Sequence, residues 1–257
     1  KAIKLIKKAI SSGDISEQNI HEKCKKILMA KSWMNLHDFQ TIDISSIDDS
    51  LTTEKTQKIN YGLIKSSITL LQNYDDIIPF KRLDTLKIAS LSIGKNFNSF
   101  QESLNLYAKV DTFSINEGAD IKNQALVLDQ LSKYNLVIVS VHKSNANAWK
   151  DFKISKNTDI FLQTIALQSK VVLSVFANPY SINSFLFTDN FDAMVLGYQN
   201  SSLAQHIVAQ SIFGGLSING NIPVSTKHFS INSGYSTDSI RLSYGLKLYK
   251  NFNKILE

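Results

Sequence analysis

Residues 136–141, Leu-Val-Ile-Val-Ser-Val, and residues 171–177, Val-Val-Leu-Ser-Val-Phe-Ala, are two strand-sized runs with almost no polar side chains. Neither run alternates between apolar and polar residues, as a strand with one face in water would. Continuous apolar strands are typical of parallel sheets that helices cover on both faces. We therefore expect a parallel sheet in the core of this protein.

Further runs rich in branched residues extend this pattern in both directions along the chain. Strand-like runs cover residues 67–72, 87–93, 109–115, 136–141, 170–177 and 191–196. Helical patterns between them cover residues 98–106, 121–133, 157–169, 182–187 and 202–213. This alternation predicts an α/β fold, a doubly wound, mainly parallel sheet with flanking helices and right-handed crossovers. There are too few strand and helix pairs for an eight-fold barrel.

The first 53 residues follow a different pattern. Apolar residues at helical spacing predict a helix over Ala2–Ile10 and a second helix that runs to about Met34, with Ser16 as its N-cap. On the second helix we expect Cys24 to be a core residue. The predicted organisation is a helical segment over 1–35, a linker over 36–53, an α/β sandwich domain over 54–245 that begins with an amphipathic helix at 54–65, and a C-terminal tail over 246–257.

Composition excludes several classes of protein. The chain has 257 residues, 43% of them hydrophobic and 19% charged, as expected for a folded globular protein. No apolar run approaches the roughly 18–20 residues that span a bilayer, so we expect no membrane span. The net charge is +6, but only two of the 28 basic residues are arginines, and the lysines are spread out apart from two groups near the N-terminus. Because arginine forks are preferred for reading bases and phosphates, we expect no nucleic-acid partner.

Targeting signals and cofactor motifs are not found in the sequence. It begins with Lys1 and lacks a signal-peptide layout, so we interpret it as a piece of a longer protein, and export of that parent to the periplasm or cell surface is left open. The motifs G-x-G-x-x-G and G-x-x-x-x-G-K-[ST] are absent, and so is the nucleophile motif G-x-S-x-G. A single cysteine allows neither an internal disulfide nor a multi-cysteine zinc site. We therefore predict no cofactor and no metal.

Ligands of open α/β sheets bind beyond the carboxyl ends of the strands, where this sequence places four polar loops. The loops are Gly94–Asn96, His142–Asn145, Asn178–Tyr180 and Gly197–Asn200. The crossing that starts at His142 is the longest and contains Trp149, whose ring could equally stack on a sugar or base or cover the sheet edge. His142 is either a proton-transfer group or, as we favour, a hydrogen-bonded structural histidine. We select His142, Lys143, Asn145 and Trp149 as candidate substrate-rim residues.

A catalytic pair of carboxyl groups is not evident. Glu117 and Asp120 precede a helix start, where the helix dipole favours acids, and Asp189 and Asp192 flank a predicted strand start at the amino end of the sheet, the wrong side for the site. The two histidines of the C-terminal third, His206 and His228, lack metal-ligand spacing and are expected to be surface or core residues. We predict no catalytic residue in this chain.

The order of five segments resembles the C-terminal part of glycoside hydrolase family 3, in particular that of bacterial β-N-acetylglucosaminidases. AIKLIKKAISSGDISEQNIHEKCKKILMAKSWMNL (2–36) resembles the helical exit from the catalytic barrel of that family, and SSITLLQNYDDIIPF (66–80) resembles the start of its second domain. The other segments are KVVLSVFANPYSINSF (170–185), FDAMVLGYQNSSLAQHIVAQSIFGGLSINGNIPVS (191–225) and RLSYG (241–245). Together they cover nearly the whole chain.

The resemblance implies a role and a partner. In the family, a retaining reaction uses an aspartate nucleophile and, in the N-acetylglucosaminidase branch, an Asp-His acid/base pair, all on the preceding barrel. No family catalytic residue therefore maps onto this chain, which would brace or rim the active site of an N-terminal barrel of the same polypeptide that hydrolyses an amino-sugar glycoside. Two alternatives stay open: a free-standing carbohydrate or peptidoglycan-fragment binding module, and an independent enzyme of flavodoxin-like shape.

Overall fold

The computed structural model describes residues 1–38, 41, 43–95, 98–144 and 152–245. It divides the chain into two compact units, Lys1–Thr53 and Glu54–Glu257, and each is described by itself. Within the described ranges, no helix has both the length and the apolar character needed to cross a membrane.

Unit 1, Lys1–Thr53, consists of helices. The two longer ones are α1 (Ala2–Ser11) and α2 (Glu17–Trp33), and the hydroxyl of Ser16 caps α2 by accepting a hydrogen bond from the backbone N–H of Asn19 at 3.2 Å, as the sequence predicts. The stretch that we interpreted as a linker contains a 3-10 turn, η1 (Ile44–Ser46), and a short helix, α3 (Ile47–Leu51).

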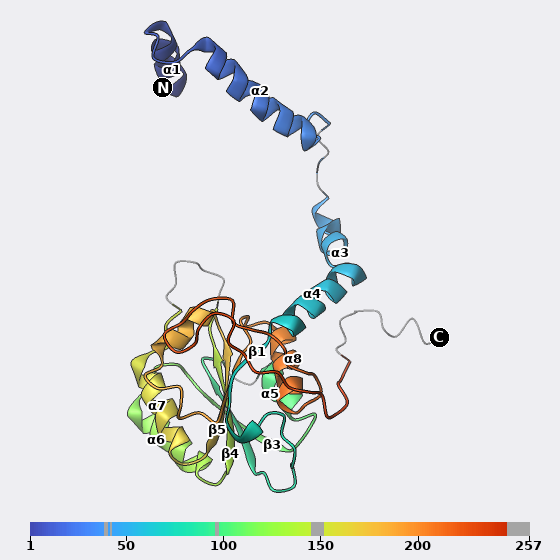
Figure 1. Cartoon of the computed structure of the whole chain (residues 1–257), viewed down its shortest axis with the longest axis vertical. Coiled ribbons are helices and arrows are strands. Elements are labelled where there is room, and N and C mark those ends of the chain that lie inside the picture. The colour runs from blue at the N-terminus through green and yellow to red at the C-terminus, as the bar shows by residue number, and fades with distance from the viewer. Residues whose placement is uncertain (39–40, 42, 96–97, 145–151, 246–257) are drawn as a thin grey trace, which may run out of the picture. The chain divides into compact units, whose positions relative to one another are not determined.

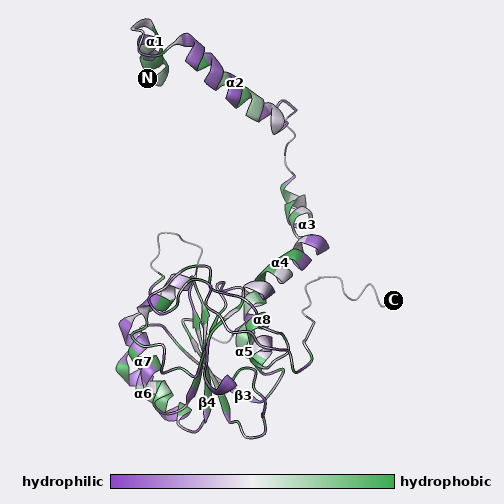
Figure 2. Ribbon diagram, viewed as in Figure 1, coloured by the Kyte–Doolittle hydropathy of each residue, from purple (hydrophilic) through white to green (hydrophobic). Residues whose placement is uncertain are grey.

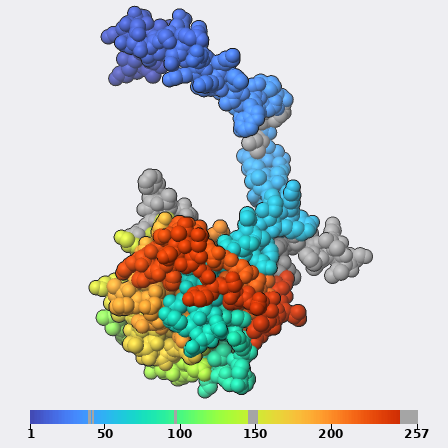
Figure 3. Space-filling view, in the orientation of Figure 1, coloured from blue at the N-terminus to red at the C-terminus, as the bar shows by residue number. Residues whose placement is uncertain are grey.

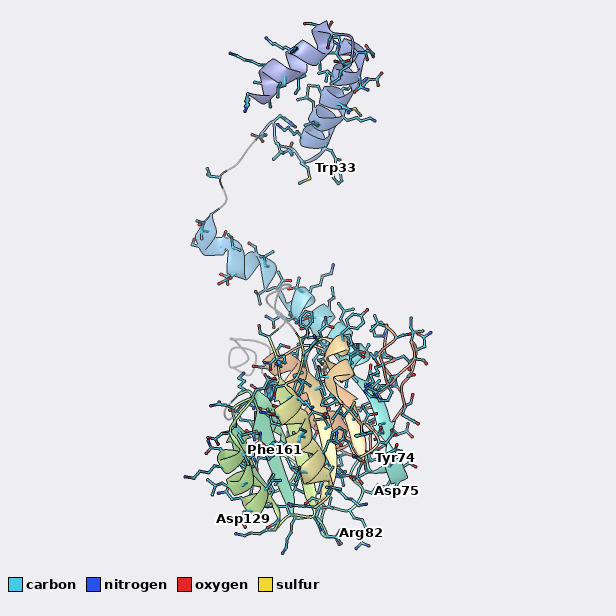
Figure 4. All side chains as sticks on the ribbon, turned by 90° about the vertical axis from the view of Figure 1, so that its left-hand side faces the viewer. Trp33, Tyr74, Asp75, Arg82, Asp129 and Phe161 are labelled. Carbon is cyan, nitrogen blue, oxygen red and sulfur yellow. The ribbon has the colours of Figure 1, made fainter. Side chains whose placement is uncertain are left out.

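The prediction that Cys24 is a core residue is wrong, because its side chain is exposed. None of the described residues of unit 1 is buried, and large apolar side chains such as Ile3 and Trp33 are 72% and 85% exposed. Figure 4 shows Trp33 at the surface of this unit. The helical period places Cys24 correctly along α2, but unit 1 by itself is too small to enclose that face of the helix.

Unit 2, Glu54–Glu257, is built on a six-stranded sheet with the order β1-β6-β5-β4-β2-β3. The strands are β1 (Thr69–Asn73), β2 (Ile88–Ile93), β3 (Val110–Ile115), β4 (Leu136–His142), β5 (Lys170–Phe176) and β6 (Ala193–Leu196). Strands β2 to β6 are parallel, and β1 is antiparallel to β6, which confirms the mainly parallel sheet. Every residue of β2 and β4 is buried, which explains the continuous apolar runs in the sequence.

Helices cover both faces of this sheet (Figure 1). One face packs against α4 (Glu54–Ser67), α5 (Ser99–Leu104) and α8 (Ser202–Ile212), and the other against α6 (Ile121–Leu131) and α7 (Lys156–Ala166). Neighbouring residues of β4 point to opposite faces, with Ile138 in the core beneath α5 and α8 and Val139 in the core beneath α6 and α7. Figure 2 shows that α6 and α7 carry both hydrophilic and hydrophobic residues.

The helix that we predicted over residues 182–187 is instead a 3-10 helix that begins earlier, η3 (Pro179–Ser184). The side chain of Asn178 accepts a hydrogen bond from the backbone N–H of Tyr180 at 3.0 Å and so caps this turn. Pro179 fits the first helical position, where no N–H is required. The cap and the proline together fix the start of η3.

The segment 216–245 protects the edge strand β1. It forms isolated bridges with Thr69 through Gly220 and with Leu70 through Tyr235, and Figure 3 shows this red-coloured segment beside the teal residues that follow α4. Arg241 holds the segment in place, because its Nη1 donates to the carbonyl oxygen of Phe213 at 2.7 Å. These contacts satisfy backbone groups that an exposed edge strand would leave open to other chains.

We expect a Gly220→Ala substitution to destabilise unit 2. A Cβ atom at Gly220 would lie 2.4 Å from the carbonyl oxygen of Ile68, so the segment would have to move away from β1. The expected loss in the free energy of unfolding is about 1–3 kcal/mol, measured by urea denaturation. Gly62→Ala is the matched control, because nothing lies within 4 Å of that site in α4, and it should stabilise the protein by about 0.5–1 kcal/mol. Equal stability of Gly220→Ala and wild type would show that the close approach is not needed.

Candidate functional site

The strand order reverses between β2 and β4, which marks the crevice where open α/β sheets bind ligands. The chain leaves β2 through α5 to reach β3 on one side, and leaves β3 through α6 to reach β4 on the other side of β2. Gly94 and Lys95 follow β2 at this crevice, and Lys143 and Ser144 follow the last residue of β4, His142.

His142 is enclosed by protein groups. Its side chain is 4% exposed, and its ring stacks on Phe176 with centroids 5.1 Å apart. Its Nδ1 lies 2.8 Å from the Oδ1 of Asn200, which also accepts a hydrogen bond from Gln205. Since this oxygen is an acceptor, the His142 proton lies on Nδ1, and Nε2 accepts from the hydroxyl of Ser140 at 3.0 Å. Both ring nitrogens are therefore occupied within the protein.

Burial lowers the pKa of His142 to about 4, and the nearby positive charge of Lys95 acts in the same direction. The hydrogen bond with Asn200 opposes this shift but does not outweigh the burial. The ring is therefore neutral at pH 7. The geometry favours the hydrogen-bonded structural role over proton transfer.

The hydrogen bonds around His142 extend to both helices on that face of the sheet. Gln205, on α8, accepts from the backbone N–H of Phe100 at 3.2 Å and donates to Asn200 at 2.8 Å. Asn98 caps α5 by accepting from the N–H of Gln101 at 3.2 Å, and donates to the hydroxyl of Ser92 in β2 at 2.8 Å. The polar network thus fixes α5 and α8 against the carboxyl ends of β2 and β4.

We did not select Asn98, Asn200 or Gln205 from the sequence as site residues. Three signals were present: an asparagine directly before the helical pattern of α5, a glutamine in the apolar pattern of α8, and the place of Asn200 in the Gly197–Asn200 loop that we expected at the carboxyl ends of the strands. None of these signals shows which side chains meet, because that depends on how distant segments pack.

Lys143 forms a partly buried ion pair with Glu117, in the loop after β3. Its Nζ lies 2.5 Å from Oε2 of Glu117, and the two side chains are 18% and 24% exposed. The other carboxylate oxygen of Glu117 accepts from the backbone N–H of Ser155, the N-cap of α7, at 3.2 Å. Glu117 therefore links the loops that follow β3 and β4, at the edge of the sheet where the parallel strands end, which we call the carboxyl edge. It also neutralises the charge of Lys143.

Asn145 and Trp149, the other two candidates, lie outside the described residues. Their assignment to a substrate rim stays a prediction. Asn178, in the third loop that we singled out, is occupied in capping η3.

Asp189 and Asp192 lie near the opposite, amino edge of the sheet. They line a depression of about 510 Å³ together with Tyr74 and Lys170, the first residue of β5. Asp192 accepts from the backbone N–H of Val171 at 2.8 Å. Burial and the Asp189 carboxylate raise the pKa of Tyr74, whose hydroxyl bonds to Asp189. Both acids thus have structural partners, and the described part of the chain gathers no metal-binding group of three His, Cys, Asp or Glu residues.

The two histidines for which we expected structural positions are also hydrogen-bonded. The Nδ1 of His206 bonds to the hydroxyl of Ser103, and burial lowers the pKa of His206. The Nε2 of His228 donates to the carbonyl oxygen of Phe185 at 2.8 Å. Neither belongs to a group of three or more His, Cys, Asp or Glu side chains within the described residues.

We expect the free energy of unfolding to fall as the pH drops from 6.5 to 4. The unfolded chain binds a proton at His142 near pH 6.5, whereas the folded protein binds it only near pH 4, so acid favours the unfolded state by about 3 kcal/mol from this residue. Urea unfolding at a series of pH values measures the effect. His142→Gln cannot titrate and should lose this part of the pH dependence, while His206 still contributes in both proteins. Identical pH profiles would contradict the assignment.

A double-mutant cycle with Glu117→Gln and Lys143→Met tests the ion pair. The pair is shielded from water, so we expect a coupling energy of about 1 kcal/mol, at the upper end of the range for exposed pairs. Urea unfolding of the two single variants, the double variant and the wild type gives this value. Additive losses would mean that the two charges do not interact in solution.

No protein-family model matches the sequence. No curated protein matches it either. Solved structures do share the fold, among them a glycoside hydrolase family 3 β-N-acetylglucosaminidase from Paenibacillus sp. strain FPU-7, with a TM-score of 0.60 and 18% identity over 83% of this chain and 40% of that one.

Two further structures are similar to this chain. A fungal multi-domain β-N-acetylglucosaminidase of the same family matches with a TM-score of 0.61 and 18% identity over 91% of this chain and 26% of that one. A β-glucosidase from Listeria innocua matches with a TM-score of 0.63 and 16% identity over 84% of this chain and 33% of that one. This chain therefore spans less than half the length of each of these proteins. At such identities, the likeness shows that the chain shares its fold with one part of each of the three glycosidases.

Proposed function

We propose that this chain is the C-terminal part of a family 3 glycoside hydrolase of the β-N-acetylglucosaminidase type, and that its α/β unit is accessory to a catalytic barrel on the same polypeptide. One observation carries the proposal. At least 83% of the chain matches structures of glycosidases, yet it corresponds to no more than 40% of each of the three named above. The remaining length of those proteins leaves room for a separate catalytic domain.

The carboxyl edge of the sheet suits a supporting role. His142 is neutral and doubly hydrogen-bonded, and Lys143 is paired with Glu117. These contacts hold the strand-end loops in fixed positions and use the polar groups of His142, Lys143 and Glu117 within the protein. Such an edge can form one side of a sugar-binding site. We propose that Asn145 and Trp149, in the loop between His142 and Ser155, contact the sugar.

The environment of the acids supports a catalytic domain separate from this chain. Glycoside hydrolysis usually uses two carboxyl groups on either side of the scissile bond, about 5–9.5 Å apart. Glu117 is held by Lys143 and by a backbone N–H, and Asp159 is fully buried, where it accepts from the backbone N–H of Leu186 at 3.0 Å. Asp189 and Asp192 lie at the other edge of the sheet. We therefore propose that the catalytic acids belong to the barrel.

Unit 1 supports a barrel partner independently. Its helices expose apolar side chains that a water-soluble helix normally buries, including Leu28 and Met29 at 58% and 62% exposure. We propose that these faces pack against the barrel, as the resemblance of residues 2–36 to a barrel exit implies.

Hydrolysis of 4-nitrophenyl N-acetyl-β-glucosaminide tests the proposal. The protein encoded by the complete gene should release nitrophenolate, whereas the 257-residue chain alone should show no turnover, because Glu117 and Asp159 have structural partners and Asp189 and Asp192 lie at the other edge of the sheet. The corresponding β-glucoside serves as the comparison substrate and should be cleaved more slowly by the complete protein. Activity of the 257-residue chain equal to that of the complete protein would disprove the accessory role, and no activity of either protein would disprove the glycosidase assignment.

A further inference from the structure

The amino edge of the sheet carries a row of lysines that the proposed function does not use. Lys87 directly precedes β2, Lys109 directly precedes β3, Lys133 precedes β4 by three positions, and Lys170 is the first residue of β5. These are four consecutive parallel strands in the sheet, in the order β5-β4-β2-β3. Although far apart in the sequence, the lysines gather at one edge, opposite the carboxyl edge described above.

Three of these lysines line one cavity. Lys87, Lys109 and Lys133 surround a cavity of about 360 Å³ with Asp111 and Tyr134, and Leu86 and Ile88 complete its lining. Ile88 pairs with Val110 in the sheet register, so Lys87 and Lys109 occupy equivalent positions on neighbouring strands, about 4.8 Å apart along the sheet. We refer to this cavity as the lysine pocket.

The lysine pocket has an excess of positive charge. Within the described part of the chain, no carboxylate lies in ion-pair distance of the ammonium groups of Lys87, Lys109 or Lys133. Asp111, the acid in the lining, accepts the hydroxyl of Tyr134 at 2.8 Å. Asp84, close in sequence, is paired with Arg82 at 3.0 Å, and Figure 4 shows Arg82 at this end of the sheet. Three ammonium groups and one carboxylate leave a net charge of +2, and like charges in one cavity repel one another unless an anion joins them.

We infer that the lysine pocket binds a phosphate group, either free phosphate or the phosphate ester of a sugar. A phosphate monoester carries close to two negative charges at neutral pH and presents three strong acceptor oxygens, which matches the charge and the number of the ammonium groups. A single carboxylate would balance only half of the charge. Lysine serves as a point charge in phosphate sites, so the site does not need arginine forks. The ring of Tyr134 forms an apolar wall on which a sugar attached to the phosphate can pack.

Amide chemical shifts of the 257-residue chain, recorded during titration, test this inference. The probes are inorganic phosphate, glucose 6-phosphate and acetate, each at the same ionic strength set with sodium chloride. We expect saturable shifts at Lys87, Lys109 and Tyr134 with both phosphate probes. Tighter binding of glucose 6-phosphate would identify a sugar ester as the ligand, and equal binding would identify phosphate itself.

Two variants and a matched control complete the test. Lys87→Gln and Lys109→Gln should each weaken phosphate binding by about five- to tenfold, because each removes one charge next to the anion. These two lysines are exposed and precede strands, so the fold and the unfolding midpoint should not change. Lys122→Gln changes an exposed lysine in the first turn of α6 that is not in the lining and should bind as wild type does. The inference is wrong if acetate causes the same shifts, if no shift saturates, or if Lys122→Gln weakens binding as much as Lys109→Gln.

Discussion

The burial of both faces of the parallel sheet constrains everything else in unit 2. All residues of β4 and all but the first residue of β5 are buried, with helices on either side. Such strands have no face left for chemistry, since a charged side chain in the middle of the sheet would lose its water without gaining a partner. Functional groups are therefore confined to the two edges where the strands begin and end. This explains why the candidate site and the lysine pocket lie at opposite ends of the same strands.

The carboxyl edge shows how polar groups are accommodated beside that core. His142 is buried but neutral, and each nitrogen has a partner, so the ring is retained at low energetic cost. Ser140 and Ser174 pair in register on neighbouring strands, yet only the Ser140 hydroxyl reaches His142, whereas the Ser174 hydroxyl has no partner among the described residues. The network therefore does not reach β5 and extends instead from β4 through Asn200 and Gln205 to α8. It makes this edge a rigid support whose geometry depends on helices as well as strands.

The sequence predicted the sheet well, because a two-sided core requires continuous apolar runs that are visible without any knowledge of packing. The predicted start of β2 at residue 87 and the observed start at Ile88 differ by one position, since strand ends depend on pairing rather than composition. Cys24 shows where such patterns fail. The apolar spacing correctly predicted that Cys24 lies in a helix, but burial also requires a partner surface, which the described residues of unit 1 do not provide. The His142 network was missed for a related reason, because Asn200 lies 58 positions from His142 in the chain. Local patterns reveal which residues are polar, whereas only tertiary packing determines which of them meet.

The two edges also differ in charge, and this difference bears on what each can bind. At the carboxyl edge, Lys143 is neutralised by Glu117 and His142 carries no charge at pH 7, which leaves the single positive charge of Lys95 near His142. This edge therefore carries less charge than the lysine pocket and suits a ligand such as a glycoside, which is held by hydrogen bonds and ring stacking. At the amino edge, no carboxylate of the described residues forms an ion pair with Lys87 or Lys109, and a bound anion would relieve their repulsion. A sheet buried on both faces separates the two edges by the full length of its strands. A ligand at one edge can therefore bind without altering the electrostatic environment of the other, because interactions over that distance are largely screened by salt.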